Sequence, residues 1–274
     1  MWYSPAYLKF KKIIFGIWYL LRNPRLLHYV FEEGDFWRKY LKKQYQLPKG
    51  LPCIEIKEIL PDFSVHLDKV AFLGGSSMPT DLALLKGLAT TIPDCQFFEI
   101  GTWRGESVVN VAAAAKHCYT LNLSKAAIES MGLSSIYADL HGFFSKGKDN
   151  ITHLEGNSMD YDFSQHPKMD LIFIDGDHQY RMVKNDTEKV FQHLVHDHTI
   201  VVWHDAAYHP EAMRMEVVAG VLDGLPAAAR SRVYYVHNTM CAVYLPNSTP
   251  THDFLEFPKR PTTAFEINIK HRQL

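Results

Sequence analysis

From residue 79 onward, short runs of apolar residues alternate with longer segments in which apolar positions recur every three or four residues. The short runs are typical of buried strands, and the longer segments are typical of helices that cover a sheet. This alternation predicts a parallel sheet with helices on both faces. The expected strands are, in chain order, CQFFEIG, HCYTLNL, ITHLEGN, DLIFIDG, TIVVWHD, SRVYYVHN and MCAVYLP.

The last two of these strands are separated by almost no residues, and this spacing predicts an antiparallel hairpin. We therefore expect an α/β fold with a seven-stranded sheet, mostly parallel, that ends in this hairpin. The clearest helices are expected over PTDLALLKGLA, ESVVNVAAAAK and YRMVKNDTEKVFQHLV.

The N-terminal part of the chain has a different pattern. Residues 6–45 predict two helices, the second of which would begin at Pro24, and residues 46–75 are rich in proline and glycine and predict a linker. We expect a helical extension with its linker over 1–75, a main domain over 76–250 and a tail over 251–274.

Charge differs between these parts. Residues 1–50 hold ten Lys and Arg against three Asp and Glu, or +7. The rest holds 19 (29 − 10) against 27 (30 − 3), or −8. Because the whole chain is close to neutral, we expect no nucleic-acid partner.

The N-terminal helices are both aromatic and basic, which leaves two interpretations. They would form a cap on the main domain or on a second subunit of a homodimer, or they would contact a membrane surface. We favour the cap, because aromatic-rich helices are more often buried than exposed to lipid.

Cysteine usage and apolar run lengths bear on location. The four cysteines are scattered without a CxxC pair, which predicts neither a zinc site nor a disulfide framework. The longest apolar run, IIFGIWYLL, has nine residues, whereas a membrane span needs about 20. No cleavage site follows it, so no signal peptide is expected. A cytoplasmic location is the simplest prediction, with peripheral membrane contact as the alternative.

The segment FFEIGTWRGES is the first candidate for ligand binding. Gly101 and Gly105 bracket a tight turn between a strand and a helix, where backbone N–H groups and the helix N-terminus would face a ligand. The spacing E-x-G-x-x-x-G differs from the G-x-G-x-x-G of dinucleotide-binding proteins, so it disfavours dinucleotide-linked redox chemistry. An ordinary strand–helix turn is the alternative interpretation.

Acidic and imidazole side chains follow two of the expected strands. Asp175, Asp177 and His178 come directly after DLIFI, and His204 and Asp205 follow TIVVW. Ligands of open α/β sheets bind beyond the carboxyl ends of the strands, so we expect these side chains to converge on the crevice that the glycine turn also faces. Asp177 would alternatively cap the following helix.

The order of these segments resembles the class I S-adenosylmethionine-dependent methyltransferases, and most nearly the group with sugar and macrolide O-methyltransferases. FFEIGTWRGES resembles their motif I, and CYTLNLS, EGNSMDYDF, DLIFIDGDHQY and VVWHDAAY resemble the later strand segments in order. The resemblance covers about residues 76–246. It implies a Rossmann-like fold, S-adenosyl-L-methionine as cofactor, and O-methylation of a hydroxyl on a sugar or a related small polar acceptor.

The resemblance also implies a cofactor site. Two positions depart from the family pattern, because acids are usual where Asn122 and often where Asn157 stand. Exchanging a charged for a neutral hydrogen bond costs about 1 kcal/mol, or roughly fivefold to tenfold in affinity. A catalytically silent cofactor-binding or assembly protein therefore stays an alternative. The implied cofactor residues are Met78, Glu99, Gly101, Thr102, Trp103, Gly105, Ser107, Asn122, Leu123, Asn157, Ser158 and Asp175.

For catalysis, the resemblance implies that His178 takes the hydroxyl proton and that Asp175 and Asp205 bind a divalent cation, Mg²⁺ or Mn²⁺. His204 departs from the pattern, because the family usually has an acid or amide there and magnesium prefers oxygen. Imidazole at this position indicates a softer metal with His204 as a ligand, or no metal and His204 as a second base. A metal-dependent hydroxylase-like enzyme on the same scaffold is the alternative function.

Overall fold

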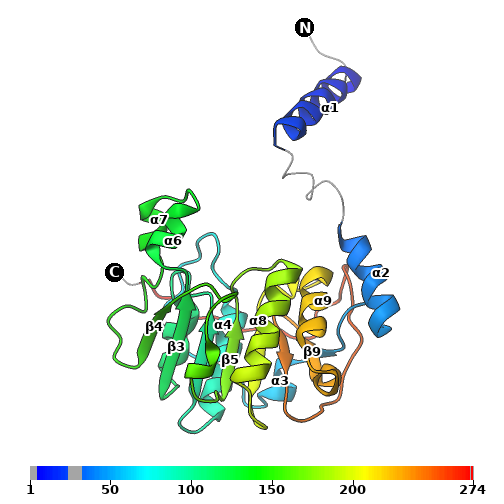
Figure 1. Ribbon diagram of the computed structural model, residues 1–274. Helices are drawn as coiled ribbons and strands as arrows, with labels where there is room; N and C mark the ends of the chain where they lie inside the picture. The colour runs from blue at the N-terminus through cyan, green and yellow to red at the C-terminus, as the bar shows by residue number, and fades with distance from the viewer. Residues whose placement is uncertain (1–4, 24–32, 272, 274) are drawn as a thin grey trace. The chain divides into compact units, whose positions relative to one another are not determined.

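The computed structural model describes residues 5–23, 33–271 and 273. The chain divides into two compact units, Met1–Pro48 and Lys49–Leu274. The first unit contains α1 (Pro5–Arg22) and α2 (Glu33–Tyr45), so the two predicted N-terminal helices are both present (Figure 1). The predicted start of the second helix at Pro24 lies outside the described residues.

The described part of the second unit contains an eight-stranded sheet in the order β1-β9-β10-β6-β5-β2-β3-β4. All of the expected strands are present, and the pairings among β6, β5, β2, β3 and β4 are parallel. The predicted hairpin is also confirmed, because β10 is antiparallel to both β9 and β6. The seven expected strands are β2 (Gln96–Ile100), β3 (His117–Asn122), β4 (Ile151–Glu155), β5 (Leu171–Ile174), β6 (Ile200–Trp203), β9 (Val233–Val236) and β10 (Ala242–Tyr244).

The eighth strand comes from the segment that the sequence pattern assigns to a linker. β1 (Cys53–Ile54) pairs in parallel with β9 at the edge of the sheet, and α3 (Ile56–Ile59) follows it. Residues 66–76 are also bound to the main unit; for example, the Asp68 N–H donates to Asn110 Oδ1 at 2.9 Å. The chain therefore divides at Pro48 and Lys49 rather than near residue 75.

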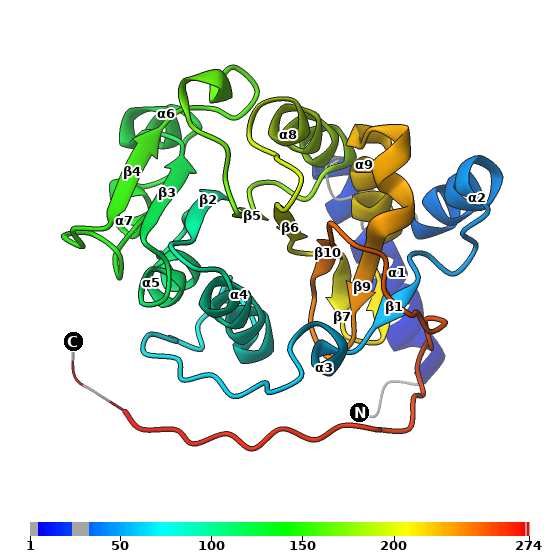
Figure 2. The same cartoon turned by 90° about the horizontal axis from the view of Figure 1, so that it is seen from below.

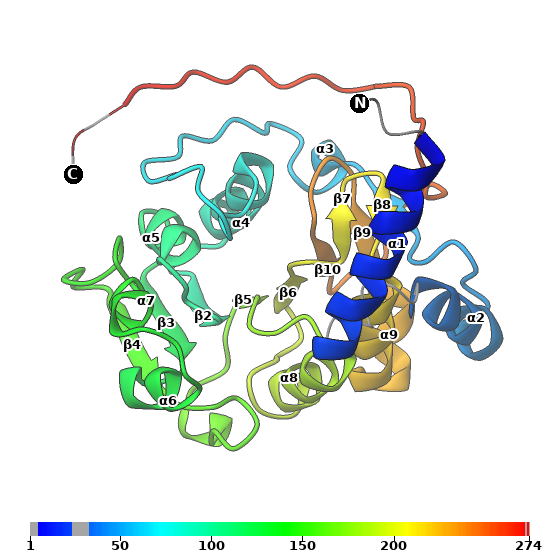
Figure 3. The ribbon, with the colours of Figure 1, turned by 90° about the horizontal axis from the view of Figure 1, so that it is seen from above.

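Helices cover both faces of the sheet (Figure 2). α4 (Pro79–Thr91) and α5 (Glu106–Ala112) lie on one face, and α8 (Tyr180–His193) and α9 (Met215–Gly224) lie on the other. Figures 2 and 3 show the C-terminal tail running along the face covered by α4. Further elements, which the pattern does not predict, are α6 (Lys125–Ser130), α7 (Ser135–Asp139), β7 (Ala207–His209) and β8 (Ala212–Met213).

The core lies between the sheet and these helices. Central strand residues such as Phe97, Phe173 and Val202 have no exposed surface, as expected for parallel strands buried on both faces. None of the described helices combines the length and the apolar character needed to cross a membrane.

Candidate active site

The strand order brings the predicted site segments to one edge of the sheet. Ile100 at the end of β2 pairs with Ile174 of β5, which in turn pairs with Trp203 of β6. Because these strands are parallel and adjacent, the glycine turn, Asp175 and the His204–Asp205 pair all emerge at the same edge. The expected emergence of these segments at one edge of the sheet is therefore confirmed, whereas the shared crevice stays a prediction.

The glycine turn requires glycine because protein backbone packs against it. Gly101 has φ +97° and Gly105 has φ +78°, both in the left-handed region. A Cβ atom on Gly101 would collide with the Asp175 carbonyl oxygen, and one on Gly105 would collide with Ser145 Oγ. The sequence argument assigned this freedom to the approach of a ligand, whereas the structure assigns it first to the contact between the ends of β2 and β5. A substitution at Gly101 would therefore disturb the sheet as well as the turn.

Glu99 supports the turn from inside the protein. Its carboxyl group has no exposed surface and accepts hydrogen bonds from Ser107 Oγ and from Thr120 Oγ1, the latter at 2.5 Å. Thr102 Oγ1 lies 2.6 Å from Thr120 Oγ1 and extends this network into the turn. Burial raises the pKa of Glu99 to about 8, against the smaller opposing effect of its two hydrogen bonds. Glu99 and Ser107 therefore connect the turn to β2 and β3, and their predicted contact with a cofactor stays a prediction.

The pKa of Glu99 has a consequence for stability. A folded-state pKa of about 8, above an unfolded value of about 4.3, means that the folded protein binds the proton more tightly. The free energy of unfolding should therefore fall as pH rises from about 4.3 to about 8, and then level off. We expect Glu99→Gln to lose this dependence. The free energy of unfolding of the variant minus that of the wild type should therefore increase by roughly 2–4 kcal/mol between about pH 5 and pH 8.

Urea unfolding at the two pH values measures this difference. Glu155→Gln on β4 is the matched control for replacement of a carboxyl group by an amide, because Glu155 is exposed. Parallel pH profiles for wild type and Glu99→Gln would show that Glu99 does not titrate in this range.

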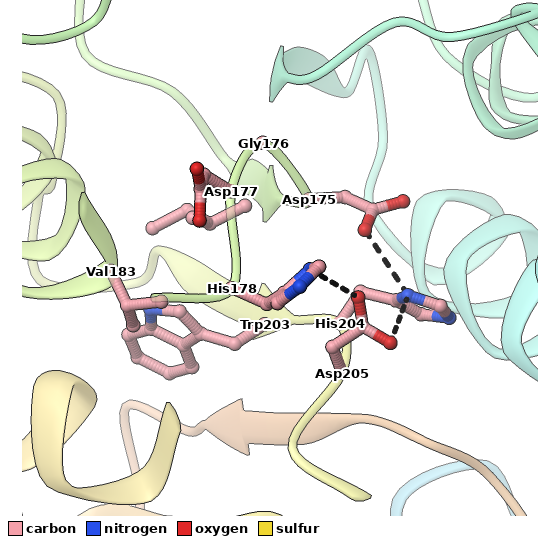
Figure 4. A pocket seen from close by; sticks show the side chains of 9 residues that line it. Asp175, Gly176, Asp177, His178, Val183, Trp203, His204 and Asp205 are labelled. Carbon is pink, nitrogen blue, oxygen red and sulfur yellow. Dashed lines mark ion pairs between the residues drawn. The ribbon is translucent and has the colours of Figure 1, made fainter. Parts of the chain in front are cut away.

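His204 is buried and lies among three carboxylates, of which Asp81 is fully buried, whereas Asp175 and Asp205 are partly exposed. Figure 4 shows the contacts of His204 with Asp175 and Asp205. Its Nε2 lies 3.0 Å from Asp81 Oδ2, and its Nδ1 lies 3.1 Å from Asp175 Oδ1 and 3.6 Å from Asp205 Oδ1. Burial alone would lower the pKa of His204, but the surrounding carboxylates outweigh it and raise the pKa well above its usual value. Both ring nitrogens face carboxylates and the residue is only 8% exposed, so the geometry does not favour the predicted role of His204 as a second base.

Asp81 is the site residue that the sequence analysis missed. It lies in the first turn of α4 with no exposed surface, and accepts hydrogen bonds from the backbone N–H groups of Met78 and Met240, both at 2.8 Å. It therefore connects the start of α4 to the end of β6 and to the β9–β10 turn. The local signal, an acid in the first turn of a helix, predicts a cap, but the contact with His204 joins residues 123 positions apart.

His178 occupies a more open position. Its side chain is 52% exposed, and its Nδ1 lies 3.8 Å from Asp205 Oδ2. Asp177 Oδ1 accepts the Gln179 N–H at 2.7 Å in the turn before α8, so Asp177 is a turn residue; the N-cap position itself is Gln179 and has no side-chain capping bond. His178 is therefore held near the carboxylates while much of its ring remains accessible.

The pKa values of the two carboxylates at the strand ends are shifted in opposite directions. Burial raises the pKa of Asp175 despite the opposing charge of His204. Burial would also raise the pKa of Asp205, but the hydrogen bond and the charge of His204 outweigh it, and the pKa of Asp205 is lowered. Asp205 also has φ +54°, a left-handed backbone conformation that is uncommon outside glycine and often found at functional sites.

Two hollows have lining residues from the predicted site segments, one at the ends of β5 and β6 and the other beside Arg104 of the glycine turn. The smaller one, of about 10 Å³, is lined by residues 174–178, Val183 and residues 203–205 (Figure 4), and is about the size of one water. The larger, of about 830 Å³, is lined partly by residues 66–71, Arg104 of the glycine turn and Phe143. Its volume is in the range of small-molecule sites.

The remaining predicted cofactor residues are divided between the turn and the two following strands. Trp103 Nε1 is a buried donor with no hydrogen-bond partner in the described part of the chain, and such an atom would be satisfied by a bound ligand. Asn122 Nδ2 donates to the Leu123 carbonyl at 3.0 Å, and Asn157 Oδ1 accepts the Met159 N–H at 3.0 Å. Their contacts with a cofactor, like those of Met78 and Ser158, stay predictions.

Comparison with known proteins agrees with this architecture. Residues 98–206, from β2 to just beyond β6, match the family model described as a methyltransferase domain. The matched segment includes the glycine turn, Asp175, His178, His204 and Asp205. No curated protein matches the chain.

Several solved structures are similar to the chain at low sequence identity. The SAH-bound methyltransferase PaMTH1 from Podospora anserina is 14% identical, with 62% of this chain and 79% of that one covered and a TM-score of 0.44. A putative caffeoyl-CoA O-methyltransferase from Staphylococcus aureus is 20% identical, with 76% and 98% covered and a TM-score of 0.44. An O-methyltransferase from Bacillus cereus in complex with SAH is 18% identical, with 77% and 99% covered and a TM-score of 0.43.

Proposed function

We propose that this chain transfers a methyl group from S-adenosyl-L-methionine to a hydroxyl of a small polar acceptor such as a sugar. The observation that carries the proposal is the convergence of the glycine turn, Asp175, His178 and Asp205 at the ends of three adjacent strands. All of these residues lie within the matched methyltransferase domain. A hydroxylase-like reaction is not favoured by that match.

The cofactor would be held by the turn and by the segments after β3 and β4. The fit rests on the buried, unsatisfied indole N–H of Trp103. Asn122 and Asn157 would provide neutral hydrogen bonds at the ends of the neighbouring strands. When bound, S-adenosyl-L-methionine supplies an electrophilic methyl group on a sulfonium.

The protein's own contribution would be to position the acceptor and remove its proton. His178 is accessible and stands 3.8 Å from Asp205, whose carboxylate would stabilise the imidazolium that forms on accepting the hydroxyl proton. As that proton moves to His178, the oxygen–carbon bond forms and the carbon–sulfur bond breaks. General-base catalysis of this kind contributes about 10²–10⁴-fold in rate.

The His204 cluster also fits a divalent cation. Ligand atoms of Asp175, His204 and Asp205 lie within 4.8 Å of one another. Asp81 accepts the Nε2–H of His204, the arrangement that orients a histidine so that its other nitrogen can bind a metal. Two carboxylates with an imidazole fit Mn²⁺ better than Mg²⁺, which prefers all-oxygen sites. Such a cation would lower the pKa of the acceptor hydroxyl and orient it.

Metal removal tests this part of the proposal. We expect chelation to lower the methyl-transfer rate by about tenfold or more, and Mn²⁺ to restore it more completely than Mg²⁺. Activity assays before chelation, after it, and after adding back each metal provide the measurement. A rate unaffected by chelation would show that the His204 imidazolium, rather than a metal, balances the carboxylates.

The reaction itself is tested with full-length protein, methyl-labelled S-adenosyl-L-methionine and a panel of hydroxyl-bearing sugars and polar metabolites. We expect acceptor-dependent label transfer to oxygen with equimolar S-adenosylhomocysteine. Binding of the cofactor without transfer to any acceptor would favour the silent, cofactor-binding alternative. Absence of cofactor binding would contradict the proposal.

A further inference from the structure

The helix α1 exposes a continuous apolar surface. Tyr7, Phe10, Ile14, Ile17 and Leu21 recur at intervals of three and four residues, which places them along one side of an α-helix. They are 49%, 63%, 53%, 55% and 77% exposed, respectively. We call these five residues the apolar strip.

Two further exposed apolar residues lie beside the apolar strip. Ile13 and Trp18, 58% and 46% exposed, widen the strip on its two sides. Single exposed apolar residues are common on protein surfaces, but a contiguous apolar patch marks an interaction site. A helix of this kind requires an apolar environment along one side.

The charged residues of α1 are all basic and lie off the apolar strip. The helix contains Lys9, Lys11, Lys12 and Arg22 and has no acidic residue. At 3.6 residues per turn, Lys12 lies opposite the strip, Lys9 lies on the flank beside Ile13, and Lys11 and Arg22 lie on the other flank beside Trp18. The Arg22 guanidinium stacks over the Trp18 ring at 4.4 Å, which places a cation beside an aromatic ring at the border.

We propose that α1 lies in the plane of an anionic membrane surface, with the apolar strip in the boundary between headgroups and acyl chains. An apolar side with Trp, Phe and Leu and a polar side with Lys and Arg are the features of interfacial helices, and each cation near an anionic surface contributes about 1 kcal/mol. A second copy of α1 is the weaker occupant, because it would bring basic flanks together without any acid to pair them. This inference does not depend on the proposed reaction.

Flotation of the full-length chain with lipid vesicles tests the inference. We expect the protein to float with vesicles of phosphatidylcholine and phosphatidylglycerol, and to bind at least about tenfold more weakly to phosphatidylcholine alone, because four cations lose their partners. High salt should weaken the binding to the anionic vesicles, because surface charges are screened.

A matched pair of variants tests the orientation of the helix. Ile14→Glu places a carboxylate in the apolar strip, and Tyr19→Glu places the same charge on the opposite side, where Tyr19 is 48% exposed. We expect Ile14→Glu to lose about tenfold or more in partitioning and Tyr19→Glu to lose clearly less, because only the first must desolvate the new charge. Replacing Lys9, Lys11 and Lys12 with glutamine should weaken binding while keeping the strip intact.

Two results would overturn the inference. One is a failure of the wild-type protein to bind anionic vesicles, or binding by Ile14→Glu that is as strong as that of the wild type. The other is a concentration-dependent dimer, measured by light scattering without lipid, that Ile14→Glu abolishes; this result would show that a second copy covers the strip.

Discussion

Replacing His204 with alanine is expected to destabilise the protein by about 3–5 kcal/mol and to abolish methyl transfer. The imidazole lies between Asp81, Asp175 and Asp205 and is 8% exposed, while Asp81 has no exposed surface at all. Removing this imidazole leaves the fully buried Asp81 and the partly buried Asp175 without the ring that pairs with both, and breaking a buried pair in this way has a cost of that size. Chemical unfolding at neutral pH measures the stability, and the label-transfer assay measures the activity.

Two variants make the interpretation specific. His204→Asn can still donate one hydrogen bond toward Asp81, so it should recover part of the stability without restoring full activity. His198→Ala is the control for loss of an imidazole, because His198 is exposed in the loop before β6, at the opposite end of that strand. If His204→Ala keeps the stability and activity of the wild type, His204 neither stabilises the carboxylates around it nor is needed for methyl transfer.

Replacing His178 with alanine is expected to lower turnover by about 10²–10⁴-fold, while the affinity for S-adenosylhomocysteine changes by less than about twofold. The residue is half-exposed and contacts Asp205 only at 3.8 Å, so its loss removes the base without disturbing the buried cluster. Single-turnover kinetics and calorimetry separate the two quantities. His209→Ala, an exposed histidine on the nearby β7, should retain activity.

A different outcome would reassign His178. If the cofactor affinity falls in parallel with turnover, the residue contributes to cofactor binding rather than to proton transfer. If turnover is unchanged, another group accepts the hydroxyl proton and the proposed mechanism is wrong at this step.

The centre of the sheet could be predicted because its strands are short, apolar and buried. β5 illustrates the point: Leu171, Ile172 and Phe173 have no exposed surface and Ile174 is 3% exposed, so an unbroken apolar run in the sequence corresponds to a central strand. β1 could not be predicted in this way, because two residues between prolines and charges show no periodicity. Its place at the sheet edge depends on a pairing with β9, far along the chain.

α9 escaped prediction for a related reason. Val217, Val218, Val221 and Leu222 are all buried, so the helix has no clear polar face. Its glycines, which usually indicate a break in a helix, instead allow close packing on α8. A Cβ atom on Gly220 would lie 2.9 Å from the Tyr180 carbonyl oxygen.

The candidate site was predictable as far as it follows strand ends. Asp175, His178, His204 and Asp205 follow apolar runs directly, and the parallel order of the strands brings them together. The link from His204 to Asp81 could not be read from any local pattern, because it depends on where α4 lies against the sheet. The hydrogen-bond network of Glu99 likewise depends on burial, which a single acid near a strand end does not reveal.

The central claim is that the glycine turn and the His178–Asp205 pair serve one bound cofactor. A crystal structure of the chain with S-adenosylhomocysteine tests it most directly. We predict that the ligand lies against the Gly101–Gly105 turn, with its sulfur directed toward His178. A ligand bound instead in the larger cavity beside Arg104, away from His178, or no bound ligand at saturating concentration, would contradict the account.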